Sequence, residues 1–134
     1  AQLAGLSLCC GGIMGLGETV EDRIDMAIDI RELGVRSIPV NFLNPIPGTP
    51  FEKNRVLSDE ERQRIIAVYR FINPEAAIRL AGGRGLFADK GRACFKSGAN
   101  AVISGDMLTT AGYSIETDLA LIADLGYEAG LHHG

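Results

Sequence analysis

The chain alternates between strand-like and helix-like segments, and this alternation constrains its fold more than any other feature. The apolar runs that predict strands are residues 6–13, 37–42, 77–81 and 100–104. The segments that predict helices are residues 18–33, 58–72, 89–97 and 115–125. Helix N-terminal caps are predicted at three places. The spacing of a capping box occurs at Thr19 with Asp22 and at Ser58 with Glu61, and Ser114 is a capping residue by itself. Four consecutive strand–helix units predict an α/β fold with parallel strands and right-handed crossovers.

Four such units can form a small open sheet or half of an eight-stranded barrel, which needs about 250 residues. Because side chains alternate along a strand, each run has one apolar face and one face of small or polar groups. The apolar faces, which we expect to pack on the helices, contain Leu6, Leu8, Ile38, Val40, Phe42, Ile78, Leu80, Ala101 and Ile103. The opposite faces would line a shared interior that contains Cys9, Asn41 and Arg79. A packed barrel fills its interior with Val, Ile and Leu. The small and polar residues here instead favour half of a (βα)8 TIM-type barrel whose interior holds a polar group.

Length and composition limit the class of protein. The 134 residues are enough for one domain, which we expect to span residues 1–134. The net charge is −4 and the sequence has no basic cluster, which argues against nucleic acid and membrane as partners. Three cysteines do not make a disulfide framework and suit a reducing cytoplasm. The chain begins at Ala1 and enters a strand at once, so we expect its N-terminus to be a cut in a longer protein.

A glycine-rich turn at residues 11–18 joins the first predicted strand to the first helix. Glycines let a backbone approach a ligand closely, although a tight turn without a ligand is the alternative. Cys9 precedes this turn and lies on the inward face of the strand. It is interpreted either as a small core residue or as a ligand. Arg79 stands inside a short apolar strand, where it is either exposed at a fraying end or buried with a partner. Arg84, in the next loop, is expected to face solvent or to pair with a carboxylate.

Other polar and sulfur-containing residues are weaker candidates. Asn41 ends the second predicted strand, and active sites of barrels lie at strand ends; an ordinary turn residue is the alternative. Thr109 and Thr110 could donate hydrogen bonds to an anion, or cap a helix. We expect Cys10 and Cys94 to pack in the core.

Taken together, five stretches resemble the biotin synthase family of radical S-adenosylmethionine (SAM) enzymes, in the same order and at similar spacing. The stretches are residues 9–18, 39–41, 47–50, 79–84 and 105–110. The resemblance implies that the chain forms strands five to eight of a (βα)8 barrel, its second half. It also implies that the intact protein is an enzyme, a cytoplasmic sulfurtransferase. Homodimers are common in the family.

The resemblance further implies the cofactors and the substrate of the intact enzyme. The family binds SAM and a [4Fe–4S] cluster at the barrel mouth and a [2Fe–2S] cluster deeper inside. An electron donor reduces the [4Fe–4S] cluster, SAM is cleaved to a 5′-deoxyadenosyl radical, and this radical abstracts hydrogens from dethiobiotin. Sulfur insertion then closes the ring of biotin.

Residue roles follow from the resemblance position by position. Cys9 and Arg79 match ligands of the [2Fe–2S] cluster. The residues that match a segment lying against SAM are Gly11, Gly12, Ile13, Gly15 and Glu18. Asn41, Thr109 and Thr110 match positions that contact dethiobiotin. No residue of this chain is assigned as an acid, base or nucleophile, and Cys10 is given no role.

The chain also departs from the family pattern. The Cys-x3-Cys-x2-Cys motif that binds the [4Fe–4S] cluster does not occur in these 134 residues, nor do two of the three [2Fe–2S] cysteines. We therefore expect the chain alone to be inactive and to be soluble only with its other half. Two alternatives stay open. One is another radical SAM barrel of the hydrogenase-maturation or methylornithine-synthase type. The other is a noncatalytic α/β domain that binds a small anion through the glycine turn and the loop at 105–110.

Overall fold

The structure is a computed structural model that describes residues 2–106 and 112–130. Its strands are β1 (Gly12–Met14), β2 (Ser37–Phe42), β3 (Ala77–Leu80) and β4 (Ala101–Val102). Its helices are α1 (Val20–Glu32), α2 (Asp59–Ile72), α3 (Arg92–Lys96) and α4 (Ile115–Asp124), with short 3-10 turns η1 (Gln2–Ala4) and η2 (Arg84–Leu86). The strands form one parallel sheet in the order β1-β2-β3-β4, so the predicted α/β class is confirmed.

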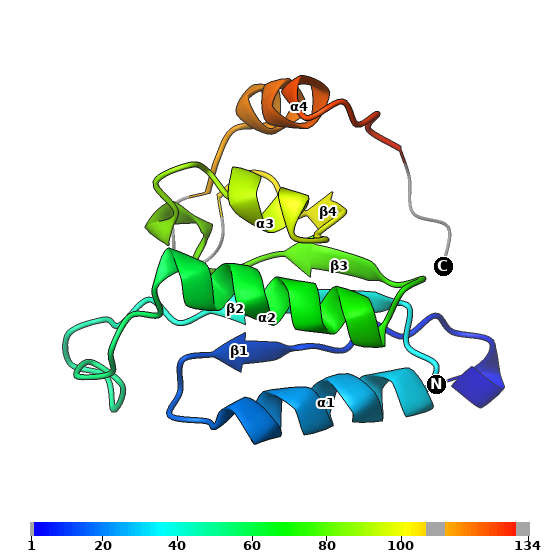
Figure 1. Cartoon of the computed structure of the whole chain (residues 1–134), viewed down its shortest axis with the longest axis horizontal. Helices are drawn as coiled ribbons and strands as arrows, with labels where there is room; N and C mark the ends of the chain where they lie inside the picture. Colours follow the sequence, from blue (N-terminus) through cyan, green and yellow to red (C-terminus); the bar gives the residue numbers. More distant parts are fainter. Residues whose placement is uncertain (1, 107–111, 131–134) are drawn as a thin grey trace.

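One apolar core joins the sheet to the helices. Figure 1 shows α2 in front of the sheet, with α1 next to it below β1 and α3 on its other side near β4. The predicted apolar faces of β2 and β3 are buried against them. Helix residues of the core include Ala27, Ile30, Ile65, Ile66, Tyr69, Cys94, Phe95 and Leu121. Within the described residues, no helix is long and apolar enough to cross a membrane.

The helix boundaries follow the local signals of the sequence. The Thr19 and Asp22 side chains each bond to the other residue's backbone N–H, and Ser58 and Glu61 do the same at the start of α2. Each arrangement is a capping box, which satisfies N–H groups that have no partner inside the helix. Gly34 follows α1 at φ +68, a backbone conformation that glycine adopts without strain. Both capping boxes were predicted and are confirmed.

The first strand is shorter than predicted. Cys9 forms only an isolated bridge with Ser37, and continuous pairing with β2 begins at Gly12. The Cys10 N–H donates to the Ser37 carbonyl at 3.1 Å, so the backbone groups of Ser37, and of Pro39 two residues on, face β1. Because Pro39 has no N–H, the ladder between β1 and β2 is interrupted there.

Two side chains near β1 are more exposed than expected. Leu6 is 62% exposed and Cys10 is also exposed, so the prediction that they pack against the helices is wrong. Both precede the continuous part of β1, an edge strand of the described sheet, and therefore lack covering neighbours. Leu8 does pack partly against the core, and Cys94 is fully buried as predicted.

The fourth strand presents the opposite face from the one predicted. Val102 pairs with Leu80 and packs on the core, whereas Ala101 pairs with Arg79 on the other side. Ile103, predicted to face the helices, is 38% exposed. Since Ala101, Val102 and Ile103 are all apolar, alternation alone cannot assign a face to this strand.

The two glycines at the start of β1 are expected to differ in tolerance to alanine. A Cβ on Gly11 would lie 1.9 Å from the Pro39 carbonyl oxygen, whereas one on Gly12 would meet the flexible Met26 side chain at 2.7 Å. We expect Gly11→Ala to lower the free energy of unfolding by about 3 kcal/mol and Gly12→Ala by less than about 1 kcal/mol. Denaturant midpoints of the full-length gene product would measure both, and equal midpoints would contradict the prediction.

Candidate functional site

Cys9 and Arg79 meet on the sheet face opposite the helices. They are 70 residues apart in sequence, yet the Arg79 Nη1 donates toward the Cys9 Sγ at 3.9 Å. The Ser37 hydroxyl donates to the same sulfur at 3.5 Å. The arrangement follows from the register, because Cys9 bridges Ser37 on one side of β2 and Arg79 pairs with Pro39 on the other.

This pair suits an anionic sulfur ligand. Cysteine sulfur is the usual ligand of iron–sulfur clusters. The Cys9 side chain is exposed rather than used in packing, so its sulfur is free to bind. Among the described residues, no three His, Cys, Asp or Glu side chains gather into a metal site. Cys9 and Arg79 therefore bring a sulfur and a guanidinium together, but among the described residues they do not make a complete metal site by themselves.

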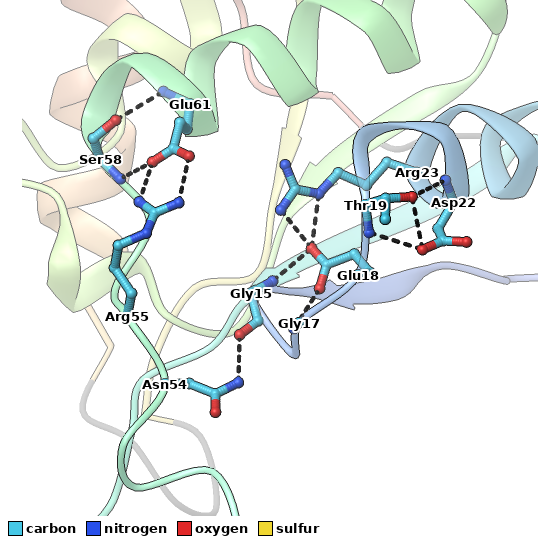
Figure 2. A network of polar contacts seen from close by, with 10 residues as sticks. All are labelled: Gly15, Gly17, Glu18, Thr19, Asp22, Arg23, Asn54, Arg55, Ser58 and Glu61. Carbon is cyan, nitrogen blue, oxygen red and sulfur yellow. Dashed lines mark hydrogen bonds and ion pairs between the residues drawn. The ribbon is translucent and has the colours of Figure 1, made fainter.

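The glycine turn between β1 and α1 is held from within by Glu18 (Figure 2). The Gly15 N–H donates to the Glu18 Oε1 at 2.7 Å, and the Gly17 N–H donates to the Oε2 at 3.1 Å. The Arg23 guanidinium binds the same carboxylate at 2.7 Å. Gly15 and Gly17 have φ values of +101 and +111, which a side chain would strain.

The charge of Glu18 is stabilised in this turn. Burial raises the pKa of Glu18, but hydrogen bonds from the Gly15 N–H and from Arg23 outweigh it, so that its pKa lies below the ordinary value. The carboxylate thus occupies the N–H groups that a bound anion would need. This geometry argues against the alternative in which the turn binds a small anion.

A second contact to the turn comes from Asn54, in the loop between β2 and α2. Its Nδ2 donates to the Gly15 carbonyl at 2.9 Å, as Figure 2 shows. Sequence reasoning missed both Asn54 and Arg23. Arg23 could have been found, since a basic residue five positions after Glu18 can fold back onto it, but Asn54 is 39 residues from Gly15 and has no local signal.

The Asn41 side chain links β2 to the start of β1 and to the segment that follows β3. Its Nδ2 donates to the Gly12 carbonyl at 3.2 Å, and its Oδ1 accepts from the Gly82 N–H at 2.8 Å. The side chain therefore belongs to the sheet rather than to a turn. It lies at the carboxyl edge, next to the glycine turn and four residues beyond Ser37 along β2, or roughly 13 Å.

Arg84 forms a buried ion pair with Asp118 of α4. Its Nη1 and Nη2 donate to the two carboxylate oxygens at 2.9 and 2.6 Å, and both side chains are 4% exposed. Of the two expectations for Arg84, pairing with a carboxylate is confirmed and exposure is wrong. Thr109 and Thr110 lie outside the described residues. The Gly105 N–H donates to the Tyr113 carbonyl at 2.9 Å, which ties the two flanks of that segment together.

Comparison with known proteins identifies first the fold and then the family. The solved structure of HydG, a maturase of the [FeFe]-hydrogenase, matches 94% of this chain and 31% of HydG with a TM-score of 0.70. The two sequences are 20% identical, so this likeness concerns the fold alone. Residues 39–128 match the Biotin and Thiamin Synthesis associated domain, and the chain belongs to this family.

Highly similar relatives are named biotin synthases. The biotin synthase of Brachyspira hyodysenteriae is 66% identical over 98% of this chain and 39% of the relative. Biotin synthase 2 of Corynebacterium diphtheriae is 62% identical over 99% of this chain and 40% of the relative. The biotin synthase of Akkermansia muciniphila is 62% identical over 93% and 39%, respectively. The chain therefore spans about two fifths of the length of these relatives.

Proposed function

We propose that this chain is the C-terminal part of a biotin synthase, an enzyme that inserts sulfur into dethiobiotin to form biotin. The observation that carries the proposal is the 66% identity to a biotin synthase across 98% of the chain. The Cys9–Arg79 pair adds a chemical reason, because it offers sulfur and nitrogen donors on the face that no described helix covers.

We further propose that the four βα units are the second half of a (βα)8 barrel. The strands follow one another in the sheet in chain order, which is the order in a barrel, whereas a doubly wound sheet reverses its order at a switch point. In this arrangement the outer edges of β1 and β4 would pair with strands from the first half. The helix-free face would then line the barrel interior.

Within that barrel, Cys9 and Arg79 would hold a [2Fe–2S] cluster, and the turn at residues 11–18 would lie against SAM. When bound, the two clusters and SAM supply radical chemistry and sulfur. Cys9 binds as a thiolate. Arg79 would supply a nitrogen beside that sulfur, because its Nη1 lies 3.9 Å from the Cys9 Sγ. The SAM-facing turn would be shaped by Gly11, Gly12, Ile13 and Gly15. The Glu18 carboxylate fixes it by accepting hydrogen bonds from the Gly15 and Gly17 N–H groups.

For the substrate, Asn41 lies at the carboxyl edge of the sheet, where barrel enzymes bind ligands. We assign contact with dethiobiotin to Asn41, Thr109 and Thr110. The intact enzyme would work in the cytoplasm with an external electron donor, and as a homodimer. The [4Fe–4S] ligands would lie in the other half of the barrel, so residues 1–134 alone are expected to form no biotin.

The direct test is biotin formation by the full-length gene product. The purified protein, reconstituted with iron and sulfide under anaerobic conditions, would be given dethiobiotin, SAM and a reductant. The proposal predicts biotin in the presence of SAM and none in its absence. Growth of a biotin synthase-deficient bacterium on dethiobiotin is the matching test in cells. Failure of both, with iron–sulfur clusters present, would refute the proposal and favour another radical SAM barrel enzyme.

A further inference from the structure

We infer that Asn54 is a positioning residue that sets the glycine turn for SAM, an inference that rests on the proposed function. Asn54 belongs to the loop between β2 and α2. This loop leaves the carboxyl edge of the sheet (Figure 1). Its side chain is half-buried, and its Nδ2 donates to the carbonyl of Gly15, a buried residue, at 2.9 Å. A buried carbonyl needs a hydrogen-bond partner, and Asn54 supplies one.

The Asn54 contact differs in kind from the other contacts of the turn. Glu18 and Arg23 act on it from within the same strand–turn–helix segment (Figure 2). The last backbone bond between β1 and the chain after β2 joins the Leu43 N–H to the Met14 carbonyl at 2.9 Å. Gly15 is the first residue beyond this bond, and its φ of +101 belongs to a residue with wide rotational freedom. Its N–H is held by Glu18 and its carbonyl by Asn54.

Packing supports the same conclusion. The loop that carries Asn54 lies against the turn, since a Cβ on Gly15 would come within 3.4 Å of the Leu43 side chain and 3.5 Å of Leu57. Leu57 itself is buried in the core. The Asn54 amide therefore links a turn that is exposed at Leu16 and Gly17 to a loop anchored in the core. Loss of the amide would leave the Gly15 carbonyl without this hydrogen bond, and we expect it to loosen the surface offered to SAM.

The test uses the cluster-loaded full-length gene product with Asn54→Ala and Asn54→Asp. The second variant keeps the shape of the side chain but replaces the donating nitrogen by an acceptor. Asn44→Ala is the matched control, because Asn44 lies in the same loop, is exposed and has no hydrogen bond among the described residues. We expect both Asn54 variants to raise the Kd for SAM, measured by anaerobic equilibrium dialysis, and the KM for SAM by roughly tenfold. The KM for dethiobiotin and the kcat at saturating SAM should stay within twofold of the wild type.

The outcomes separate this inference from the proposed function. If the wild type binds SAM and forms biotin but the Asn54 variants match Asn44→Ala, the positioning role is wrong and the function stands. If kcat falls without a change in SAM affinity, Asn54 has a merely structural role and the inference is also wrong. If the cluster-loaded wild type binds no SAM, the proposed function fails, and the inference fails with it.

Discussion

Cys9→Ala in the full-length gene product is expected to lower biotin formation by more than about 100-fold. Loss of a residue that only supports a metal ligand typically costs 10- to 100-fold, and loss of the ligand itself should exceed that range. We propose this role for Cys9 because it is exposed and its sulfur receives hydrogen bonds from Arg79 and Ser37. Iron and sulfide content and the visible absorption of the reconstituted protein would fall together with activity.

Cys10→Ala is the matched control for this prediction. Cys10 is the next residue and is also a free, exposed thiol, but its side chain alternates to the other side of the strand. We expect Cys10→Ala to keep its iron content and at least half of its activity. The activity and iron content of Arg79→Met should lie between those of the two cysteine variants, since this change removes a hydrogen-bond donor to the sulfur but leaves the sulfur in place. Equal loss in the Cys9 and Cys10 variants would contradict the assignment.

Asp118→Ala is expected to be the most destabilising single change outside the site, lowering the free energy of unfolding by about 3–5 kcal/mol. It would leave the Arg84 guanidinium buried without its counter-charge. Arg84 also donates to the carbonyls of Lys90 and Ile103 and stacks at 4.9 Å over the Tyr113 ring. These contacts hold the guanidinium in the interior, so it cannot simply turn toward water.

A second ion pair on the same helix provides the control. Asp124 pairs with Arg92, but these side chains are 64% and 38% exposed. Exposed pairs contribute at most about 1 kcal/mol, so Asp124→Ala should change stability little. The double variant Arg84→Met with Asp118→Leu should recover much of the loss, because it removes both buried charges. Denaturant midpoints of the full-length gene product would measure all three variants, and a loss from Asp118→Ala no larger than that from Asp124→Ala would contradict the prediction.

Local signals of the sequence were enough to predict the helices. The capping boxes at Thr19 and Ser58 depend on residues three apart, and the structure contains both. The third helix is shorter than predicted, because Gly91 adopts φ +92 and the helix begins only after it. Strands were harder, because their pairing depends on distant residues. Pro39 shortens β1. In β4, three consecutive apolar residues gave no alternation from which the buried face could be predicted.

The candidate site was predictable only where side-chain alternation could place residues. Alternation put Cys9 and Arg79 on the same side of the sheet, and the structure brings them within 3.9 Å. Contacts made by loop residues could not be predicted from side-chain alternation. The Asn54 bond to the glycine turn joins residues 39 apart, and the partner of Arg84 lies 34 residues away on another helix. Neither partner has a sequence signal of its own, since both depend on how the units pack.

We propose above that Cys9 and Arg79 lie at an iron–sulfur cluster. Anomalous scattering at the iron absorption edge, from crystals of the cluster-loaded full-length gene product, tests it most directly. We expect an iron peak bonded to the Cys9 Sγ and adjacent to the Arg79 guanidinium, on the sheet face opposite α1 and α2. Iron found only at other cysteines, with the Cys9 sulfur free beside Arg79, would contradict it.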